Sequence, residues 1–238
     1  MAHRSAPLTA RSSVGMAEAY ADARWPFDRV IASSAMEGRV AVLVSGSGTN
    51  LQALLDDPVI RPHLALVLSD RPNVKAIDRA EQAGIEAVVI EPDGFADRAD
   101  FDRAVLDLFR DRRIDILVSA GYMRLLGMPV LDVYSGRWLN IHPALLPSFP
   151  GMHGVRDALA YGVKVTGVTV FLVDEGVDTG PIVSQEVVEV MLDDDWDSLE
   201  ARIHAAEHRL LPAALWALIE GRIQVDGRHV RVLEPNDG

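Results

Sequence analysis

The sequence contains no cysteine and no long apolar run, and each absence excludes a class of protein. Without cysteine, the 238 residues form no disulfide bond, no catalytic thiolate and no thiolate metal site. No window holds the ~18 or more unbroken apolar residues of a membrane-spanning helix. Residues 1–35 mix Ser, Ala, Arg and Asp, and they lack the charged-then-apolar order of a secretory signal. We therefore expect a cytoplasmic protein that does not associate with a membrane.

Positive charge is scarce as well. The sequence has 23 Lys and Arg against 35 Asp and Glu, which gives a formal net charge of −12. Such a surface repels the phosphate backbone of DNA and RNA, so we expect no nucleic-acid partner. A substrate that carries phosphate would need a local site that overcomes this global field.

What the sequence does contain is a regular alternation of short apolar runs and amphipathic stretches. Strands are expected at residues 40–44, 64–68, 87–90, 114–118 and 137–141. Helical patterns lie between them, after residue 49, over residues 74–83 and after Asp97, which suits a helix cap. This alternation predicts a mostly parallel sheet flanked by helices, a Rossmann-like α/β fold with right-handed crossovers.

The pattern changes in the C-terminal part. Strand-like runs at residues 166–173 and 182–190 are separated by a turn-rich loop, so we expect them to pair antiparallel. A long helix is expected over residues 196–220, and a small hairpin is expected within residues 223–232.

An amide and an imidazole lie two residues apart at the end of the fifth expected strand. Side chains alternate along a strand, so Asn140 and His142 share one face. Pro143 ends any strand pairing, and the prolines and glycine of residues 147–151 predict a rigid loop after it. A hydrogen-bond donor and an acid/base aimed at one point suit acyl transfer. The structural alternative is a histidine held by ordinary hydrogen bonds.

A glycine loop follows the first expected strand at residues 45–50. Gly46 and Gly48 expose backbone N–H groups, and the helix that starts behind them attracts an anion at its N-terminus. No Gly-Lys-Ser/Thr follows, which excludes a P-loop, and Leu51 replaces the third glycine of a dinucleotide fingerprint. The truncated pattern fits a monophosphate site. The alternative is a tight turn that needs glycine only for packing.

Two further motifs admit both a functional and a structural interpretation. Asp178 lies in an Asp-Thr-Gly-Pro turn, where it either forms a local turn or supplies a carboxylate beside His142. His204 and His208 belong to a His-x-x-Glu-His motif whose spacing suits Zn²⁺ on one helix face. No third ligand is evident, so we favour Glu207 as a contact to a polar substrate.

Four motifs in this order resemble the family of folate-dependent phosphoribosylglycinamide formyltransferases. They are residues 44–53, 120–126, 139–151 and 173–182, and the similarity extends over about residues 39–225. The resemblance implies the formyltransferase fold and the transfer of a formyl group from 10-formyltetrahydrofolate, the co-substrate, to the amine of glycinamide ribonucleotide. That reaction yields formylglycinamide ribonucleotide and tetrahydrofolate in de novo purine biosynthesis. The resemblance implies no requirement for a metal or ATP.

The resemblance also implies a role for each matching residue. The implied catalytic residues are Asn140, His142 and Asp178. The implied contacts to the ribonucleotide are Gly48, Thr49 and Asn50 at its phosphate and Glu207 at its ribose. The implied folate contacts are Arg98, Met123, Arg124, Leu125, Leu126 and Asn140.

Other functions stay open at this level. Methionyl-tRNA formyltransferase shares the Asn-x-His and Asp motifs but is a longer chain with a C-terminal β-domain, and formyltetrahydrofolate hydrolase carries an N-terminal regulatory domain. A nucleotide-binding module without catalysis and a zinc hydrolase are the alternatives outside this group of enzymes. Monomer and homodimer are equally open.

The chain divides into an N-terminal extension, 1–37, and a formyltransferase domain, 38–238. The extension has no clear core pattern, which fits a flexible, dispensable tail. Its apolar residues, Trp25 and Phe27 among them, would alternatively anchor an arm on the domain or on a second subunit. We expect a protein that starts at Met36 to fold and to keep its activity, because no site motif lies upstream.

Overall fold

The computed structural model describes residues 38–235, and the expected N-terminal extension, residues 1–37, lies outside the described residues. A seven-stranded sheet has the order β3-β2-β1-β4-β5-β6-β7, and β8 pairs with β9 in a separate hairpin. The strands are β1 (Val40–Val44), β2 (Leu64–Ser69), β3 (Glu86–Val89), β4 (Ile116–Ser119), β5 (Trp138–His142), β6 (Val165–Leu172), β7 (Ile182–Glu189), β8 (Ile223–Asp226) and β9 (His229–Val232).

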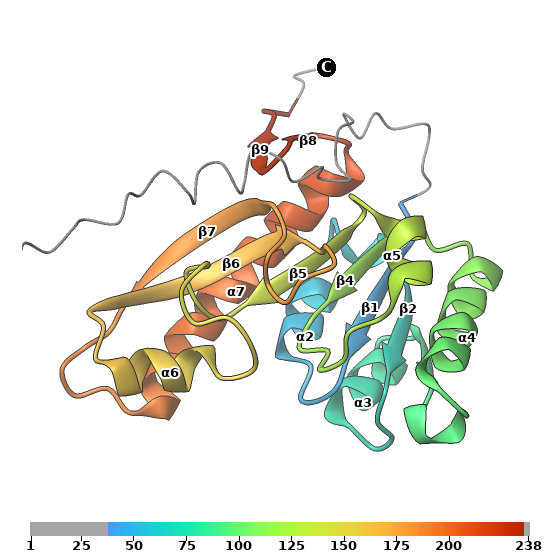
Figure 1. The fold of residues 1–238 in the computed structure, drawn as a ribbon, viewed down its shortest axis with the longest axis horizontal. Helices are drawn as coiled ribbons and strands as arrows, with labels where there is room; N and C mark the ends of the chain where they lie inside the picture. Colours follow the sequence, from blue (N-terminus) through green and yellow to red (C-terminus); the bar gives the residue numbers. More distant parts are fainter. Residues whose placement is uncertain (1–37, 236–238) are drawn as a thin grey trace, which may run out of the picture.

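Helices connect the strands and cover the sheet (Figure 1). They are α2 (Thr49–Asp56), α3 (Lys75–Gln82), α4 (Arg98–Asp111), α5 (Met128–Tyr134), α6 (Gly154–Tyr161) and α7 (Trp196–Ile219), with short 3-10 turns η1 (Arg61–His63) and η2 (Pro92–Gly94). Between residues 38 and 235, no helix has the length and apolar character needed to cross a membrane.

The predicted fold class is confirmed. Strands β1 to β5 pair parallel, whereas β5 with β6 and β6 with β7 pair antiparallel. Figure 1 shows β6 and β7 extending the sheet away from the parallel strands, with the β8–β9 hairpin beside its end. The expected hairpin near the C-terminus is therefore present as well.

Both faces of the parallel strand β1 are buried, which explains its unbroken apolar run. Val40, Val42 and Val44 pack into a core cluster that includes residues of α2, α3 and α7. Ala41 and Leu43 pack into a second cluster on the other face, with residues of α4 and α5. Each of the five residues has no exposed surface.

Local signals set several element boundaries, and two helices had no clear signal. The side chain of Asp97 accepts a hydrogen bond from the Asp100 N–H at 2.9 Å, so the predicted cap of α4 is confirmed. Helices α5 and α6 were not expected, because both are short and α6 follows directly on the proline-rich loop. The fourth strand also starts two residues later than expected, at Ile116.

Candidate active site

The predicted motifs meet at one edge of the sheet. Strand order reverses between β1 and β4, and α/β sheets bind ligands in the crevice at such a switch point. The glycine loop leaves the carboxyl end of β1, and residues 120–127 leave the carboxyl end of β4. His142 is the last residue of the neighbouring parallel strand β5. The three segments therefore surround the same crevice.

His142 has an acceptor at each ring nitrogen. Its Nε2 lies 2.8 Å from the carbonyl oxygen of Phe149, and its Nδ1 lies 3.5 Å from Oδ2 of Asp178. The residue is only 4% exposed. A protonated imidazole can donate to both oxygens, whereas a neutral one can donate to one. The structure thus brings Asp178 beside His142, which the sequence alone could not establish.

Two loops produce this geometry with uncommon backbone conformations. Phe149 has φ 53° and Asp178 has φ 55°, in the left-handed region that non-glycine residues rarely adopt. The Gly151 N–H donates to Oδ2 of Asp178 at 2.7 Å and so joins the two loops. A Cβ on Gly154 would lie 3.3 Å from Nε2 of His142, so this glycine leaves room for the ring. Such conformations persist where the surrounding structure enforces them, often at functional sites.

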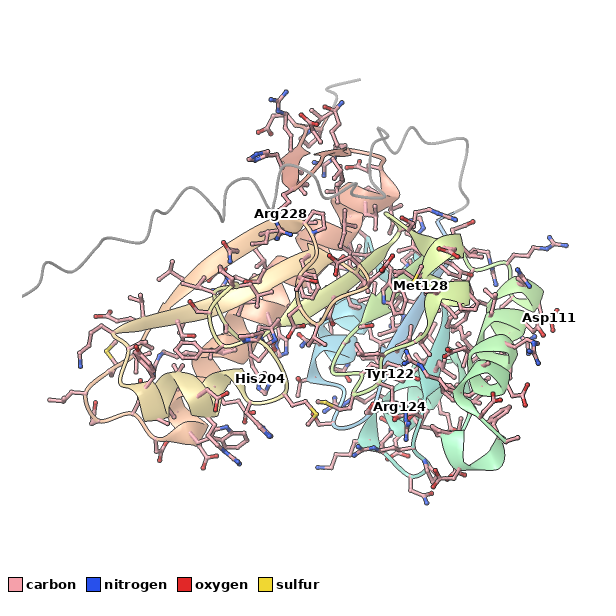
Figure 2. All side chains as sticks on the ribbon, viewed as in Figure 1. Asp111, Tyr122, Arg124, Met128, His204 and Arg228 are labelled. Carbon is pink, nitrogen blue, oxygen red and sulfur yellow. The ribbon has the colours of Figure 1, made fainter. Side chains whose placement is uncertain are left out.

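The loop that carries Asp178 is fixed at further points. Within the loop, the Thr179 hydroxyl donates to Oδ1 of Asp174 at 2.7 Å. Arg228, on the turn of the β8–β9 hairpin and labelled in Figure 2, donates from Nη1 to the Thr179 carbonyl at 2.8 Å. The terminal hairpin therefore braces the residue next to Asp178.

Asn140 lies two residues before His142 in β5. The intervening Ile141 and the preceding Leu139 both pack into the core cluster that includes α2 and α7. Because side chains alternate along a strand, Asn140 and His142 face the opposite side of the sheet together. Asn140 is partly exposed.

The glycine loop is held against α3. The Ala76 N–H donates to the Gly46 carbonyl at 3.2 Å, and Nε of Arg79 donates to the Ser47 carbonyl at 2.9 Å. Gly48 has φ 69°, and a Cβ there would lie 2.7 Å from Cβ of Ala76, so packing requires glycine at this position. A Cβ on Gly46 would meet no atom within 4 Å. The open side of the loop is therefore at Gly46.

Thr49 and Asn50 are the first two residues of α2. The first N–H groups of a helix lack acceptors within it, and Gly48 at the N-cap has no side chain to satisfy them, so the turn is suited to an anion. The buried side chain of Asn50 is directed elsewhere, since Nδ2 donates to Oε2 of Glu207 at 3.0 Å. This bond links the predicted phosphate turn to the predicted ribose contact.

Glu207 is buried in α7, and the histidines of its motif lie around it. Burial raises the pKa of Glu207 to about 7, although the hydrogen bond from Asn50 opposes the shift. Nε2 of His204, labelled in Figure 2, lies 3.9 Å from Oε2 of Glu207, and the His204 and His208 rings stack with centroids 6.0 Å apart. Among residues 38–235, no three His, Asp or Glu side chains form a group that could hold a metal ion.

A pocket of about 530 Å³ lies between residues 92–101 and the segment after β4. Four of the predicted folate contacts line it, namely Arg98, Met123, Arg124 and Leu125. Nη2 of Arg98 donates to the Leu125 carbonyl at 2.8 Å, so the arginine also shapes the pocket wall. The side chain of Leu126 instead packs in the core cluster that includes residues of α4 and α5.

Sequence reasoning missed two residues at this edge. Phe149 contacts His142 through its backbone carbonyl, which every residue type carries, so no sequence signal could have identified it. Asp70 directly follows β2 and accepts hydrogen bonds from Ser45 and Arg124. A carboxylate at the carboxyl end of a parallel strand was a signal that could have identified it.

Comparison with known proteins extends these observations. The formyl transferase family matches residues 38–215 of this chain. A phosphoribosylglycinamide formyltransferase of Bacillus subtilis is 40% identical over 184 residues, which are 76% of this chain and 94% of that protein. The trifunctional purine biosynthetic protein adenosine-3 of Drosophila melanogaster is 47% identical over 188 residues, and the match spans 77% of this chain but only 14% of that protein.

Solved structures agree with the sequence relatives. A glycinamide ribonucleotide transformylase 1 from Symbiobacterium toebii has a TM-score of 0.80 and 42% sequence identity, and the match covers 86% of this chain and 99% of that one. A phosphoribosylglycinamide formyltransferase from Bacillus halodurans has a TM-score of 0.73 and 41% identity, with 76% and 95% covered.

Proposed function

Because the chain belongs to the phosphoribosylglycinamide formyltransferase family, we propose that it transfers a formyl group from 10-formyltetrahydrofolate to the amine of glycinamide ribonucleotide. The products are formylglycinamide ribonucleotide and tetrahydrofolate, in de novo purine biosynthesis. One observation of the site supports this function above others. His142 lies between Asp178 and the Phe149 carbonyl at the edge where the glycine loop and the pocket also lie.

The acceptor site is proposed at the glycine loop. The phosphate is bound by backbone N–H groups at the start of α2, those of Thr49 and Asn50 among them. The N-terminus of the helix attracts the anion locally even though the whole chain is acidic. Gly46 leaves the space above the loop open. The Glu207 carboxylate accepts hydrogen bonds from ribose hydroxyl groups, and its bond to Asn50 keeps it in register with the phosphate turn.

The donor site is proposed at the pocket between residues 92–101 and the segment after β4. Its volume of about 530 Å³ and its mixture of apolar Met123 and Leu125 with cationic Arg98 and Arg124 fit a flat, polar-edged folate ring. The donor supplies the formyl carbon that the acceptor amine attacks. The pocket residues bind and orient this donor, and Leu126 contributes its backbone rather than its side chain.

The catalytic residues are proposed to stabilise the negative charge of the transition state and to transfer the amine proton. Negative charge develops on the formyl oxygen, and the Asn140 amide donates a hydrogen bond to it. The Nε2–H of His142 donates to the same oxygen in place of the Phe149 carbonyl that it contacts in the structure. Losing one such donor typically costs ~10²–10³ in rate. The Asp178 carboxylate lies beside Nδ1 of His142, where it orients the ring, and it takes part in moving the amine proton toward the leaving nitrogen.

The function is tested by offering the purified full chain 10-formyltetrahydrofolate with glycinamide ribonucleotide or with water as acceptor, without ATP, formate or added metal. We expect formylglycinamide ribonucleotide to form and free formate to stay at the background rate. Formate release that is independent of the ribonucleotide would indicate a hydrolase instead. A requirement for ATP and formate, or loss of transfer with a chelator, would overturn the proposal. We further propose that the enzyme acts in the cytoplasm, as the absence of cysteine suggests.

A further inference from the structure

Side chains from three separate segments meet at the carboxylate of Asp70. Oδ1 accepts from the Ser45 hydroxyl at 2.6 Å, and Oδ2 accepts from Nε of Arg124 at 3.0 Å. Asp70 follows β2, Ser45 follows β1, and Arg124 lies in the segment after β4. Its carboxylate is almost completely buried, since the Asp70 side chain is 2% exposed, whereas the Arg124 side chain is 45% exposed.

The Ser45 hydroxyl extends this network to the backbone of the donor pocket. Its proton goes to Asp70, and its oxygen accepts the Met123 N–H at 2.9 Å. Met123 and Arg124 are neighbours in the pocket lining. One carboxylate thus fixes an arginine side chain and, through a serine, the adjacent backbone N–H. The same serine is the first residue of the glycine loop, so the network joins the two substrate sites.

The cost of burying this carboxylate indicates that it has a purpose beyond stability. Taking an aspartate out of water costs several kcal/mol unless it is well paired, and an apolar replacement for a buried ion pair is often equally stable. The neighbouring Tyr122 hydroxyl is buried as well, and this burial and, secondly, the charge of Asp70 raise its pKa. Figure 2 shows Tyr122 and Arg124 together on the loop after β4.

An arginine side chain that lines a pocket loses rotamer freedom when a ligand binds to it. The long arginine side chain has much of this rotamer entropy to lose, and a guanidinium that is already fixed has lost part of it before the ligand binds. The ion pair with Asp70 uses Nε of Arg124, the guanidinium nitrogen nearest the backbone. The guanidinium is therefore fixed at Nε, while the residue still lines the pocket. A preorganised arginine binds its ligand more tightly than a mobile one.

From these contacts we propose that Asp70 is a positioning residue for the formyl donor. It orients the Arg124 guanidinium directly and the Met123 N–H through Ser45. The proposal rests on the proposed function, because it assigns the pocket to the folate. It assigns no contact between Asp70 and either substrate.

The test compares Asp70→Asn with the wild-type enzyme. Asparagine keeps the shape and an acceptor for Ser45, but it removes the charge that holds Arg124. We expect KM for 10-formyltetrahydrofolate and Kd for tetrahydrofolate, measured by calorimetry, to rise about tenfold, which corresponds to about 1.4 kcal/mol. KM for glycinamide ribonucleotide is expected to change less than twofold.

Two further variants keep the test informative if Asp70→Asn folds poorly. Arg124→Gln removes the other partner from an exposed position, and it should raise the same two donor constants. The double variant should be no worse than Arg124→Gln alone, because Asp70→Asn keeps the acceptor for Ser45 and acts on the donor only through Arg124. Glu86→Gln is the matched control, since it breaks a carboxylate pair with Arg112 at the amino end of β3, away from the crevice. It should leave both KM values unchanged.

The outcomes separate this proposal from the proposed function. A lower Tm of Asp70→Asn with unchanged donor constants, an equal rise in both KM values, or additive effects with Arg124→Gln would each overturn the positioning role. If the wild-type protein binds tetrahydrofolate but does not formylate the ribonucleotide, the proposed acceptor is wrong. The ratio of tetrahydrofolate Kd values between variant and wild type still decides the role of Asp70 in that case.

Discussion

The two sides of the crevice are built in different ways. On the parallel side, most of the proposed binding residues follow strand ends or begin a helix, and a side-chain hydrogen bond links Asn50 at the start of α2 to Glu207 in the middle of α7. At the junction with the antiparallel strands, two loops in left-handed conformations hold His142 through Phe149 and Asp178. The first arrangement follows from regular elements. The second depends on contacts between loops that are distant in sequence.

This difference suggests a division of labour. Strand ends and helix starts provide fixed N–H groups and apolar walls, which suit binding in both the ground state and the transition state. The loops around His142 position an acid/base group, which acts on the charge that develops in the transition state. Changes on the parallel side should therefore alter KM, and changes at the junction should alter kcat.

The largest expected effect comes from His142→Ala. Removing the imidazole deletes both an oxyanion donor and the acid/base, so kcat should fall about 10³-fold or more. KM for glycinamide ribonucleotide should stay within about twofold, because the glycine loop lies on the other side of the crevice. Steady-state kinetics with both substrates varied measures this. A large rise in KM with little loss of kcat would contradict the proposed division.

Asp178→Asn should lower kcat about 10²-fold, since asparagine removes the carboxylate charge that lies beside Nδ1 of His142 and orients the ring. The change also weakens the acceptor of the Gly151 N–H, so the two loops lose part of their connection. The kinetics of the double variant with His142→Ala give the sharper result. It should be little worse than His142→Ala alone, and full additivity of the two losses would argue against a shared role.

Glu207→Gln tests the buried carboxylate on the binding side. Because the pKa of Glu207 is raised from 4.5 to about 7, the folded protein binds this proton more tightly than the unfolded chain does. The resulting stability is full below pH 4.5 and is lost as the pH rises to about 7. Urea unfolding at pH 5 and pH 8 should show that the variant gains stability over the wild type on the order of 2–3 kcal/mol at the higher pH only. If the free energies of unfolding of the variant and the wild type differed equally at both pH values, ionisation of Glu207 would not be the cause of the difference.

The glycine loop offers a smaller and more selective test. A substitution at Gly48 is a poor test, because a Cβ there would collide with Ala76. It would therefore disturb the fold as well as the binding of a phosphate. Gly46→Ala adds a methyl group into open space, so folding should be unaffected. KM for the ribonucleotide should rise about tenfold while KM for the folate stays unchanged. Thermal unfolding serves as the control, and a matched rise in both constants would place the phosphate elsewhere.

The parallel half of the fold was readable from the sequence because local patterns determine it. The apolar run of β1 is buried on both faces, and Asp97 caps α4 as its position predicted. Helix α5 begins at Met128 and has only seven residues, so it is too short to show a periodic pattern. Helix α6 was hidden behind the prolines of the preceding loop, which indicated an irregular segment.

The site was readable in its parts but not in its assembly. Asn140 and His142 stood out as a pair within one strand, and the family resemblance that the motifs carried is confirmed. The approach of Asp178 to His142 depends on a tertiary contact that no local pattern encodes. The Phe149 carbonyl is a backbone group, so the same limit applies. The roles of these residues stay predictions until the variants are measured.

The most direct test of the division between binding and catalysis is a binding measurement without turnover. Isothermal titration of glycinamide ribonucleotide into His142→Ala and into Gly46→Ala compares the two sides of the crevice in one experiment. We predict wild-type affinity for His142→Ala and about tenfold weaker binding for Gly46→Ala. The account would be contradicted if His142→Ala lost ribonucleotide binding while Gly46→Ala retained it.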